Sequence, residues 1–214
     1  MNIQPQTIID ALNWRYATQI FDMSKPLEEE KLMTILESAR LAPSSLGIEP
    51  WKFIVVENAD IRAKLKIAGY NQPKITDSPV LIVLAYRLDL KQSMSKERIV
   101  RTVKATNMDA SAFEGLKNMI DGSLSGKSQQ EAETWAKSQA YIPLGMMIET
   151  AALLGVDAGP MEGFDANAVD EILGLKQQHL HATSMITLGY RAEDPASLRS
   201  KVRRAFDEVI EFVK

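Results

Sequence analysis

The sequence contains no cysteine among its 214 residues. This absence excludes disulfides, cysteine-based zinc sites, iron–sulfur clusters and thiol catalysis. Histidine is nearly as scarce, with only His179 and His181, and nothing marks the third ligand that a metal site would need. We interpret both histidines as structural residues ahead of a strand. If the chain carries out redox chemistry, a bound cofactor must therefore carry the electrons.

Several diagnostic patterns are missing as well. The sequence has no G-x-G-x-x-G segment, no Walker motif and no G-x-S-x-G elbow, which weakens the case for a dinucleotide-binding, P-loop or hydrolase fold. The first residues lack the pattern of a signal peptide, and the apolar run at Val80–Tyr86 is far shorter than the ~20 residues of a membrane helix. A net charge of −3 gives no basic field for nucleic acid. We expect a cytoplasmic protein.

The composition predicts one folded domain over residues 1–214, because hydrophobic residues make up 45% of the chain and charged residues 25%. Apolar spacing predicts five helices, at Thr7–Arg15, 26–41 with Ser24 as its cap, Ile61–Ala68, 128–154 behind a capping box, and Phe164–Leu173. Branched and aromatic runs predict strands at Lys52–Val56, Val80–Tyr86 and Ala182–Tyr190. This order predicts an α+β fold, with helices packed on a central mixed sheet.

Two segments do not fit this simple pattern. Residues 88–127 are polar and predict a helical excursion over the surface, where a substrate lid would lie. At residues 202–214 the apolar spacing favours a helix, whereas the β-branched and aromatic composition also suits an extended tail. Ile142–Leu154 is apolar nearly all round and predicts a buried helix or a subunit contact.

Polar groups gather at several turns and could bind a flat, polar ring that carries a phosphate. Pro43, Ser44, Ser45 and Gly47 follow a helix and precede Trp51, so hydroxyls, backbone N–H groups and an aromatic ring lie close in sequence. Arg15 follows the first helix, while Lys201 and Arg203 follow the last strand, and such cations suit a phosphate. The alternative for each cation is a solvated surface charge.

Two further turns offer groups for the edge and face of such a ring. Asn71 and Lys74 flank Pro73 and would supply an amide and an ammonium, although a turn asparagine and an exposed lysine are the plainer interpretation. Pro160, Met161, Glu162 and Gly163 precede a short helix, so their free N–H groups could meet a carbonyl or a ring nitrogen. The plainer interpretation here is a simple helix entry.

Taken together, these segments resemble the FMN-dependent nitroreductases, especially the oxygen-insensitive NAD(P)H nitroreductase and dihydropteridine reductase-like branch. The resemblance rests on five segments in family order, and only residues 88–127 have no convincing counterpart. The segments are R-Y-A-T-Q-I-F-D at 15–22, A-P-S-S-L-G-I-E-P-W-K-F at 42–53, N-Q-P-K-I-T-D-S-P at 71–79, G-P-M-E-G-F-D at 159–165, and L-G-Y-R followed by S-K-V-R-R within 188–204.

The resemblance implies a nitroreductase-like fold, an intertwined homodimer with FMN sites at the subunit interface, and NADH or NADPH as electron donor. It implies a role for each candidate residue. Arg15, Lys201 and Arg203 would hold the FMN phosphate, beside backbone contacts at Tyr16 and Ala17. Asn71 and Lys74 would face the pyrimidine edge, and Pro160, Met161, Glu162 and Gly163 would approach N5 and O4. Pro43, Ser44, Ser45 and Gly47 would come from the partner subunit, which the C-terminal tail would embrace.

The implied activity is a two-electron, ping-pong transfer from NAD(P)H to a nitroaromatic, a quinone or a similar acceptor. No acid–base side chain is needed, so no catalytic residue is named. Departures from the family pattern are Gln19, where relatives often carry a cation beside the ring, and Gly47 and Glu49, where Asn and Gln are usual. The alternatives are flavin cleavage or reductive dehalogenation in the same fold, and a non-enzymatic flavin-binding redox sensor.

Overall fold

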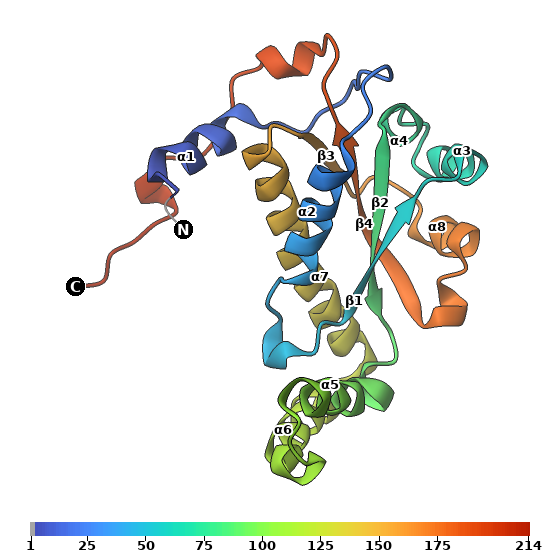
Figure 1. The fold of residues 1–214 in the computed structure, drawn as a ribbon, viewed down its shortest axis with the longest axis vertical. Coiled ribbons are helices and arrows are strands. Elements are labelled where there is room, and N and C mark those ends of the chain that lie inside the picture. Colours follow the sequence, from blue (N-terminus) through green and yellow to red (C-terminus); the bar gives the residue numbers. More distant parts are fainter. Residues whose placement is uncertain (1–2) are drawn as a thin grey trace.

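The computed structural model describes residues 3–214, and at its centre lies one four-stranded sheet (Figure 1). The strands are β1 (Trp51–Val56), β2 (Val80–Arg87), β3 (Asp157–Met161) and β4 (Leu180–Gly189), in the spatial order β1-β2-β4-β3. All three pairings are antiparallel. The predicted mixed sheet is therefore corrected to an antiparallel one, with parallel pairing only at an isolated bridge between Ala17 and Ala158.

Eight α-helices surround this sheet within the described residues. They are α1 (Pro5–Trp14), α2 (Glu29–Arg40), α3 (Ala59–Ala68), α4 (Lys74–Asp77), α5 (Leu90–Thr106), α6 (Glu114–Ser125), α7 (Gln129–Leu153) and α8 (Ala166–Leu173). Figure 1 shows α2 and α7 on one face of the sheet and α3 and α8 on the other. The predicted α+β arrangement, a central sheet flanked by helices, is confirmed.

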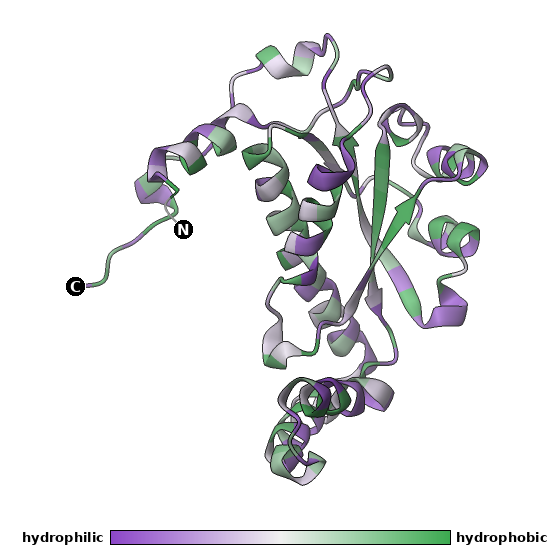
Figure 2. Ribbon diagram, in the orientation of Figure 1, coloured by the Kyte–Doolittle hydropathy of each residue, from purple (hydrophilic) through white to green (hydrophobic). Residues whose placement is uncertain are grey.

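The apolar character of β2 follows from its place between two cores. Leu81 and Val83 face the core under α3 and α8, whereas Ile82 and Leu84 face the core under α2 and α7. All four side chains are fully buried, and β2 is coloured as hydrophobic along most of its length in Figure 2. Successive residues of a strand point to opposite faces, so a strand covered on both sides must be apolar throughout.

The observed helix ends match the caps predicted from the sequence, except at the start of α2. Ser128 accepts from Glu131 N at 3.2 Å in the predicted capping box of α7. Gly174 ends α8 with a left-handed φ of 63°. The cap predicted at Ser24 is wrong, because α2 begins only at Glu29 and the Ser24 hydroxyl donates to Asp22 Oδ1 at 2.6 Å.

Residues 88–127 contain α5 and α6, which pack against each other beyond one end of the sheet (Figure 1). A third apolar cluster joins them to β2 and to the start of α7, through residues that include Tyr86, Leu90, Met94, Ile120 and Ala132. This insert therefore has a core of its own. Its predicted role as a lid stays a prediction.

The C-terminal tail, residues 202–214, contains no α-helix and only a short 3₁₀ turn at Phe206–Glu208. The helix that its apolar spacing favours is therefore wrong. The tail runs past α1 and away from the sheet (Figure 1), and Val202 and Val213 are 87% and 92% exposed. Within one chain, the apolar residues of the tail have no core to pack against. A helix there would therefore gain no stabilisation from tertiary packing. Over residues 3–214, no helix is both long and apolar enough to cross a membrane.

Candidate functional site

The predicted phosphate-binding cations lie together at the end of α1. Lys201 Nζ donates to the carbonyl oxygens of Leu12 and Asn13, at 2.7 and 2.5 Å, which fixes the lysine beside the last turn of this helix. Burial and the nearby charges of Arg15 and Arg203 lower the pKa of Lys201. Burial and Arg203 likewise lower the pKa of Arg15. Like charges brought together in this way favour an anion between them.

An unsatisfied donor points to the same conclusion. Arg15 Nε is buried and has no hydrogen-bond partner among the described residues. A buried donor left without an acceptor costs about 1–3 kcal/mol, more when the group is charged. The segment after α1 is therefore stabilised if a ligand oxygen accepts from this guanidinium.

Asp194 anchors the segment that carries Tyr16, Ala17 and Gln19. Its Oδ2 accepts from the Tyr16 hydroxyl at 2.9 Å, from Gln19 N at 2.8 Å and from Ile20 N at 3.2 Å. Asp194 is only 5% exposed. Burial together with this carboxylate raises the pKa of Tyr16 to about 12, because both disfavour the phenolate. The Gln19 side chain turns back and donates to Ala17 O at 2.7 Å.

A second buried carboxylate, Asp157, fixes the other side of this segment. Arg191 donates to it twice, from Nε to Oδ1 at 2.7 Å and from its backbone N to Oδ2 at 2.9 Å. The Arg191 guanidinium also lies 4.3 Å from the centre of the Trp14 ring and 4.6 Å from that of Tyr16. Trp14 is partly exposed, and cation–π stacking at such sites contributes about 0.5–1 kcal/mol. Sequence reasoning assigned no role to Asp157, Asp194 or Arg191, although Arg191 ends the L-G-Y-R segment and the two carboxylates lie within a few residues of quoted segments.

Lys74 at the start of α4 is 4% exposed, and burial lowers its pKa while the charge of Asp194 opposes that change. No hydrogen bond from Nζ to another residue within 3–214 is present. Gly159 of β3 lies beside its side chain, and a Cβ there would meet Thr18 O at 2.6 Å and Lys74 Cδ at 3.5 Å. Glycine at this position therefore allows β3, the Tyr16–Gln19 segment and Lys74 to pack closely. The exposed lysine of the plainer interpretation is wrong.

The Gln72 side chain joins the two turns that were predicted to face the ring. Its Nε2 donates to Gly163 O at 2.7 Å and to Gly69 O at 3.1 Å. This brings the turn of Asn71, which has a left-handed φ of 60°, next to the segment after β3. Glu162 accepts from the Tyr141 hydroxyl at 2.6 Å, so its side chain is held while its backbone stays free.

The predicted turn at Pro160–Gly163 needs a correction. Pro160 and Met161 are the last residues of β3, and only Glu162 and Gly163 lie in the turn before α8. Among the hydrogen bonds of residues 3–214, none has the backbone N–H of Glu162 or Gly163 as its donor. These are the free N–H groups that the sequence led us to expect.

The α2–β1 loop, residues 41–50, lies at the opposite end of α2 from the segment that follows α1 (Figure 1). It contains Pro43, Ser44, Ser45 and Gly47, and one chain does not bring them to the other predicted site residues. Ser44 Oγ accepts from Glu49 N at 2.9 Å, and Ser45 N donates to Gln139 Oε1 at 2.8 Å. The loop is therefore ordered by its own contacts with α7 and α5.

The histidines lie at and just before the start of β4, where His181 lines a small pocket together with Glu162. His181 Nδ1 is 2.6 Å from Asp170 Oδ2, at the start of β4, and Asp170 also accepts from Ala182 N at 2.9 Å. His179 has a left-handed φ of 54° just before that strand. No group of three histidine, aspartate or glutamate residues in the described part of the chain is arranged to hold a metal.

The structure is an α+β fold with three cations gathered at the end of α1, a buried ammonium at Lys74, and free backbone N–H groups after β3. The family model of the nitroreductase family matches residues 12–190. A Staphylococcus haemolyticus protein named "Putative NAD(P)H nitroreductase" is 37% identical over 223 residues, covering 100% of both chains. The chain therefore belongs to the nitroreductase family, which makes it an oxidoreductase and confirms the predicted resemblance.

Solved structures agree with this assignment. A nitroreductase-like structure from Bacillus subtilis has a TM-score of 0.84 at 25% identity and covers 98% of this chain and 100% of its own. A structure from Exiguobacterium sibiricum, described as a nitroreductase in complex with FMN, has a TM-score of 0.82 at 18% identity and covers 100% and 99%. The second likeness shows the fold alone. Both confirm the nitroreductase-like fold.

Proposed function

We propose that this chain is an FMN-dependent oxidoreductase that takes two electrons from NADH or NADPH and passes them to an electron-poor acceptor, such as a nitroaromatic or a quinone. The acceptor would enter the same pocket after the nicotinamide leaves, in ping-pong order. The observations that carry the proposal are the group of Arg15, Lys201 and Arg203 at the end of α1 and the buried ammonium of Lys74. The FMN of one relative and the NAD(P)H in the name of another support the choice of cofactor and donor.

The residues present fit FMN. A phosphate monoester carries about 1.5–2 negative charges at pH 7, which balances most of the charge of three clustered cations. The buried Arg15 Nε would gain an acceptor, and charge-assisted hydrogen bonds of this kind are worth about 1.5–3 kcal/mol. A dinucleotide would need a second phosphate site, and the sequence has no G-x-G-x-x-G loop to supply one.

When bound, FMN would supply hydride transfer at its N5 atom, and the protein would hold the ring and stabilise charge. Lys74, already desolvated, would lie at the pyrimidine edge and stabilise the negative charge of the reduced ring. The free N–H groups of Glu162 and Gly163 would face N5 and O4. Tyr141 would keep the Glu162 side chain aside through its 2.6 Å hydrogen bond.

We further propose a homodimer with its FMN sites at the subunit interface. The α2–β1 loop does not reach the other site residues of its own chain, so a second copy would have to supply it. Apolar side chains without cover on α1 and the tail support such a contact, since Trp14 is 41% exposed and Phe212 74%. Apolar surface of this kind marks an interaction site.

An anaerobic titration tests the proposed activity. Either NADH or NADPH should bleach the flavin of the purified protein stoichiometrically, and a nitroaromatic or a quinone should restore the oxidised spectrum. In Lys74→Ala the bleaching should be slower while FMN is largely retained, because the lysine acts on charge that develops during reduction. Lys64→Ala, an exposed lysine on α3, is the matched control. If neither NADH nor NADPH reduced the flavin, the protein would be a flavin-binding protein without this activity, and the proposal would be wrong.

A further inference from the structure

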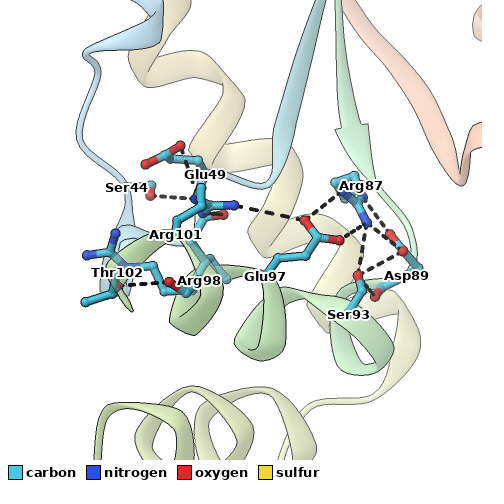
Figure 3. A network of polar contacts seen from close by, with 10 residues as sticks. Ser44, Glu49, Arg87, Asp89, Ser93, Glu97, Arg98, Arg101 and Thr102 are labelled. Atoms are coloured by element: carbon cyan, nitrogen blue, oxygen red, sulfur yellow. Dashed lines mark hydrogen bonds and ion pairs between the residues drawn. The ribbon is translucent and has the colours of Figure 1, made fainter. Parts of the chain in front are cut away.

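A polar network fastens the α2–β1 loop to α5 (Figure 3). Arg101 Nη2 of α5 donates to Ile48 O at 3.2 Å. The same guanidinium lies 4.0 Å from the carboxylates of Glu49 and of Glu97. Because these contacts join loop backbone and loop side chain to one helix, α5 fixes where the loop lies.

The network continues from α5 into the sheet. Glu97 Oε1 lies 3.0 Å from Arg87 Nη2 at the end of β2, and Asp89 Oδ2 lies 2.7 Å from the same nitrogen. Ser93 also accepts from Arg87 at 3.0 Å. Charges therefore alternate from β2 through α5 to the α2–β1 loop, and Arg87 and Arg101 both have acceptors.

Arg98, on the same helix, is the exception. Its guanidinium packs against Gly47, where a Cβ would lie 3.0 Å from both Cζ and Nη2 of the arginine. Its Nε is buried without a hydrogen-bond partner, and no side-chain hydrogen bond joins this guanidinium to any residue in 3–214. The arginine therefore fills the space in which a side chain at position 47 would begin, and it brings unused donors there.

We propose that Arg98 of α5, packed against the α2–β1 loop, enters the FMN site of the partner subunit together with this loop, where it stabilises the negative charge of the reduced flavin. This inference rests on the proposed function, which places the loop on the partner's flavin. Two features of this chain support this role for Arg98. Gly47 leaves room for the guanidinium, and Gln19 provides no cation from the subunit that holds the flavin. Fixed donors of this type stabilise charge in a water-poor site.

Spectroelectrochemistry of the holoprotein tests this role. In Arg98→Ala and Arg98→Gln the affinity for reduced FMN relative to oxidised FMN should fall about tenfold, which lowers the midpoint potential by about 30 mV for a two-electron couple. Arg98→Lys keeps the charge and should retain most of the potential. Lys96→Ala is the matched control, since this exposed lysine lies two residues away on the other side of α5.

The possible results distinguish a failure of the inference about Arg98 from a failure of the proposed function. If Arg98→Ala and Arg98→Gln bind FMN, dimerise and share the wild-type potential, the arginine only packs the loop and the inference is wrong. An equal drop in Lys96→Ala would also overturn it, because the effect would then belong to the charge of the whole helix. A wild-type protein that binds no FMN would refute the proposed function itself. Thermal unfolding of each variant identifies any that fails to fold.

Discussion

At the residue scale, the proposed FMN phosphate site depends on single cations at the end of α1. Arg15 has a buried Nε without an acceptor, and its pKa and that of Lys201 are lowered by burial and by neighbouring positive charges. An arrangement of this kind is unfavourable in the empty protein and becomes favourable with an anion. Arg203 belongs to the same group but lies in the exposed tail, which makes it the cleanest position to test.

Arg203→Ala should weaken FMN binding by about 1.5–3 kcal/mol, because the phosphate loses one charge-assisted partner. The fold should persist, since among the described residues the exposed Arg203 side chain donates one hydrogen bond, to Val202 O. Fluorescence titration of the apoprotein with FMN measures the change. Arg204→Ala removes the neighbouring exposed charge and should leave the affinity nearly unchanged. Equal losses in both variants would show that the tail acts only through its net charge.

The Tyr16 hydroxyl gives a second prediction, on pH. Its pKa is raised to about 12 in the folded protein against about 10 when unfolded, so the folded state favours the neutral phenol. This contribution to stability is complete below pH 10 and is lost as the pH rises towards 12. The difference in tyrosinate absorbance between wild type and Tyr16→Phe isolates this group. In Asp194→Asn the titration midpoint of Tyr16 should move towards pH 10. An unchanged midpoint would show that Asp194 does not cause the raised pKa of Tyr16.

Elements were predictable where a repeating pattern or a specific cap marks them. The apolar run of β2 and the capping box of α7 are examples, because burial on both faces and reciprocal capping leave direct traces in sequence. β3 was missed since Gly159 and Pro160 depress strand propensity. Its place at the edge of the sheet, paired only with β4, explains why proline is tolerated there. In the tail, apolar spacing alone favoured a helix and was wrong, because that face has nothing to pack on, whereas the extended tail that the resemblance implied agrees with the absence of an α-helix in residues 202–214.

The candidate site shows the same limit. The positions of Arg15, Lys74 and Glu162 could be inferred from family motifs, which link distant segments without any structural reasoning. Asp157 and Asp194 could not, because a lone carboxylate has no period and its partners come from segments more than 30 residues away. Composition and spacing identify neighbours along the chain, whereas these contacts depend on tertiary packing.

The capping box of α7 provides a prediction at the level of an element. Ser128→Ala removes the acceptor for Glu131 N and should lower the free energy of unfolding by about 1 kcal/mol. Chemical denaturation of the apoprotein measures the loss. Ser138→Ala is the control, as that serine lies inside the same helix and donates only to Thr134 O. A larger loss at Ser138 would contradict the importance of the cap.

At the scale of the whole molecule, the predicted site residues form two groups that do not meet within one chain. The cations, Lys74 and the turn after β3 lie around β3 and the end of α1, while the α2–β1 loop lies at the far end of α2 (Figure 1). The exposed apolar side chains of α1 and the tail are the surface through which a second copy would cover the site. We expect FMN binding and dimer formation to depend on each other.

The most direct test of this account is sedimentation equilibrium of the purified protein, followed through the absorbance of its flavin, with chromatography of the released cofactor. We predict two chains per particle and one FMN per chain. FMN on a stable monomer would contradict the interface site, and stoichiometric FAD or no flavin would contradict the assignment of the cation group to the FMN phosphate.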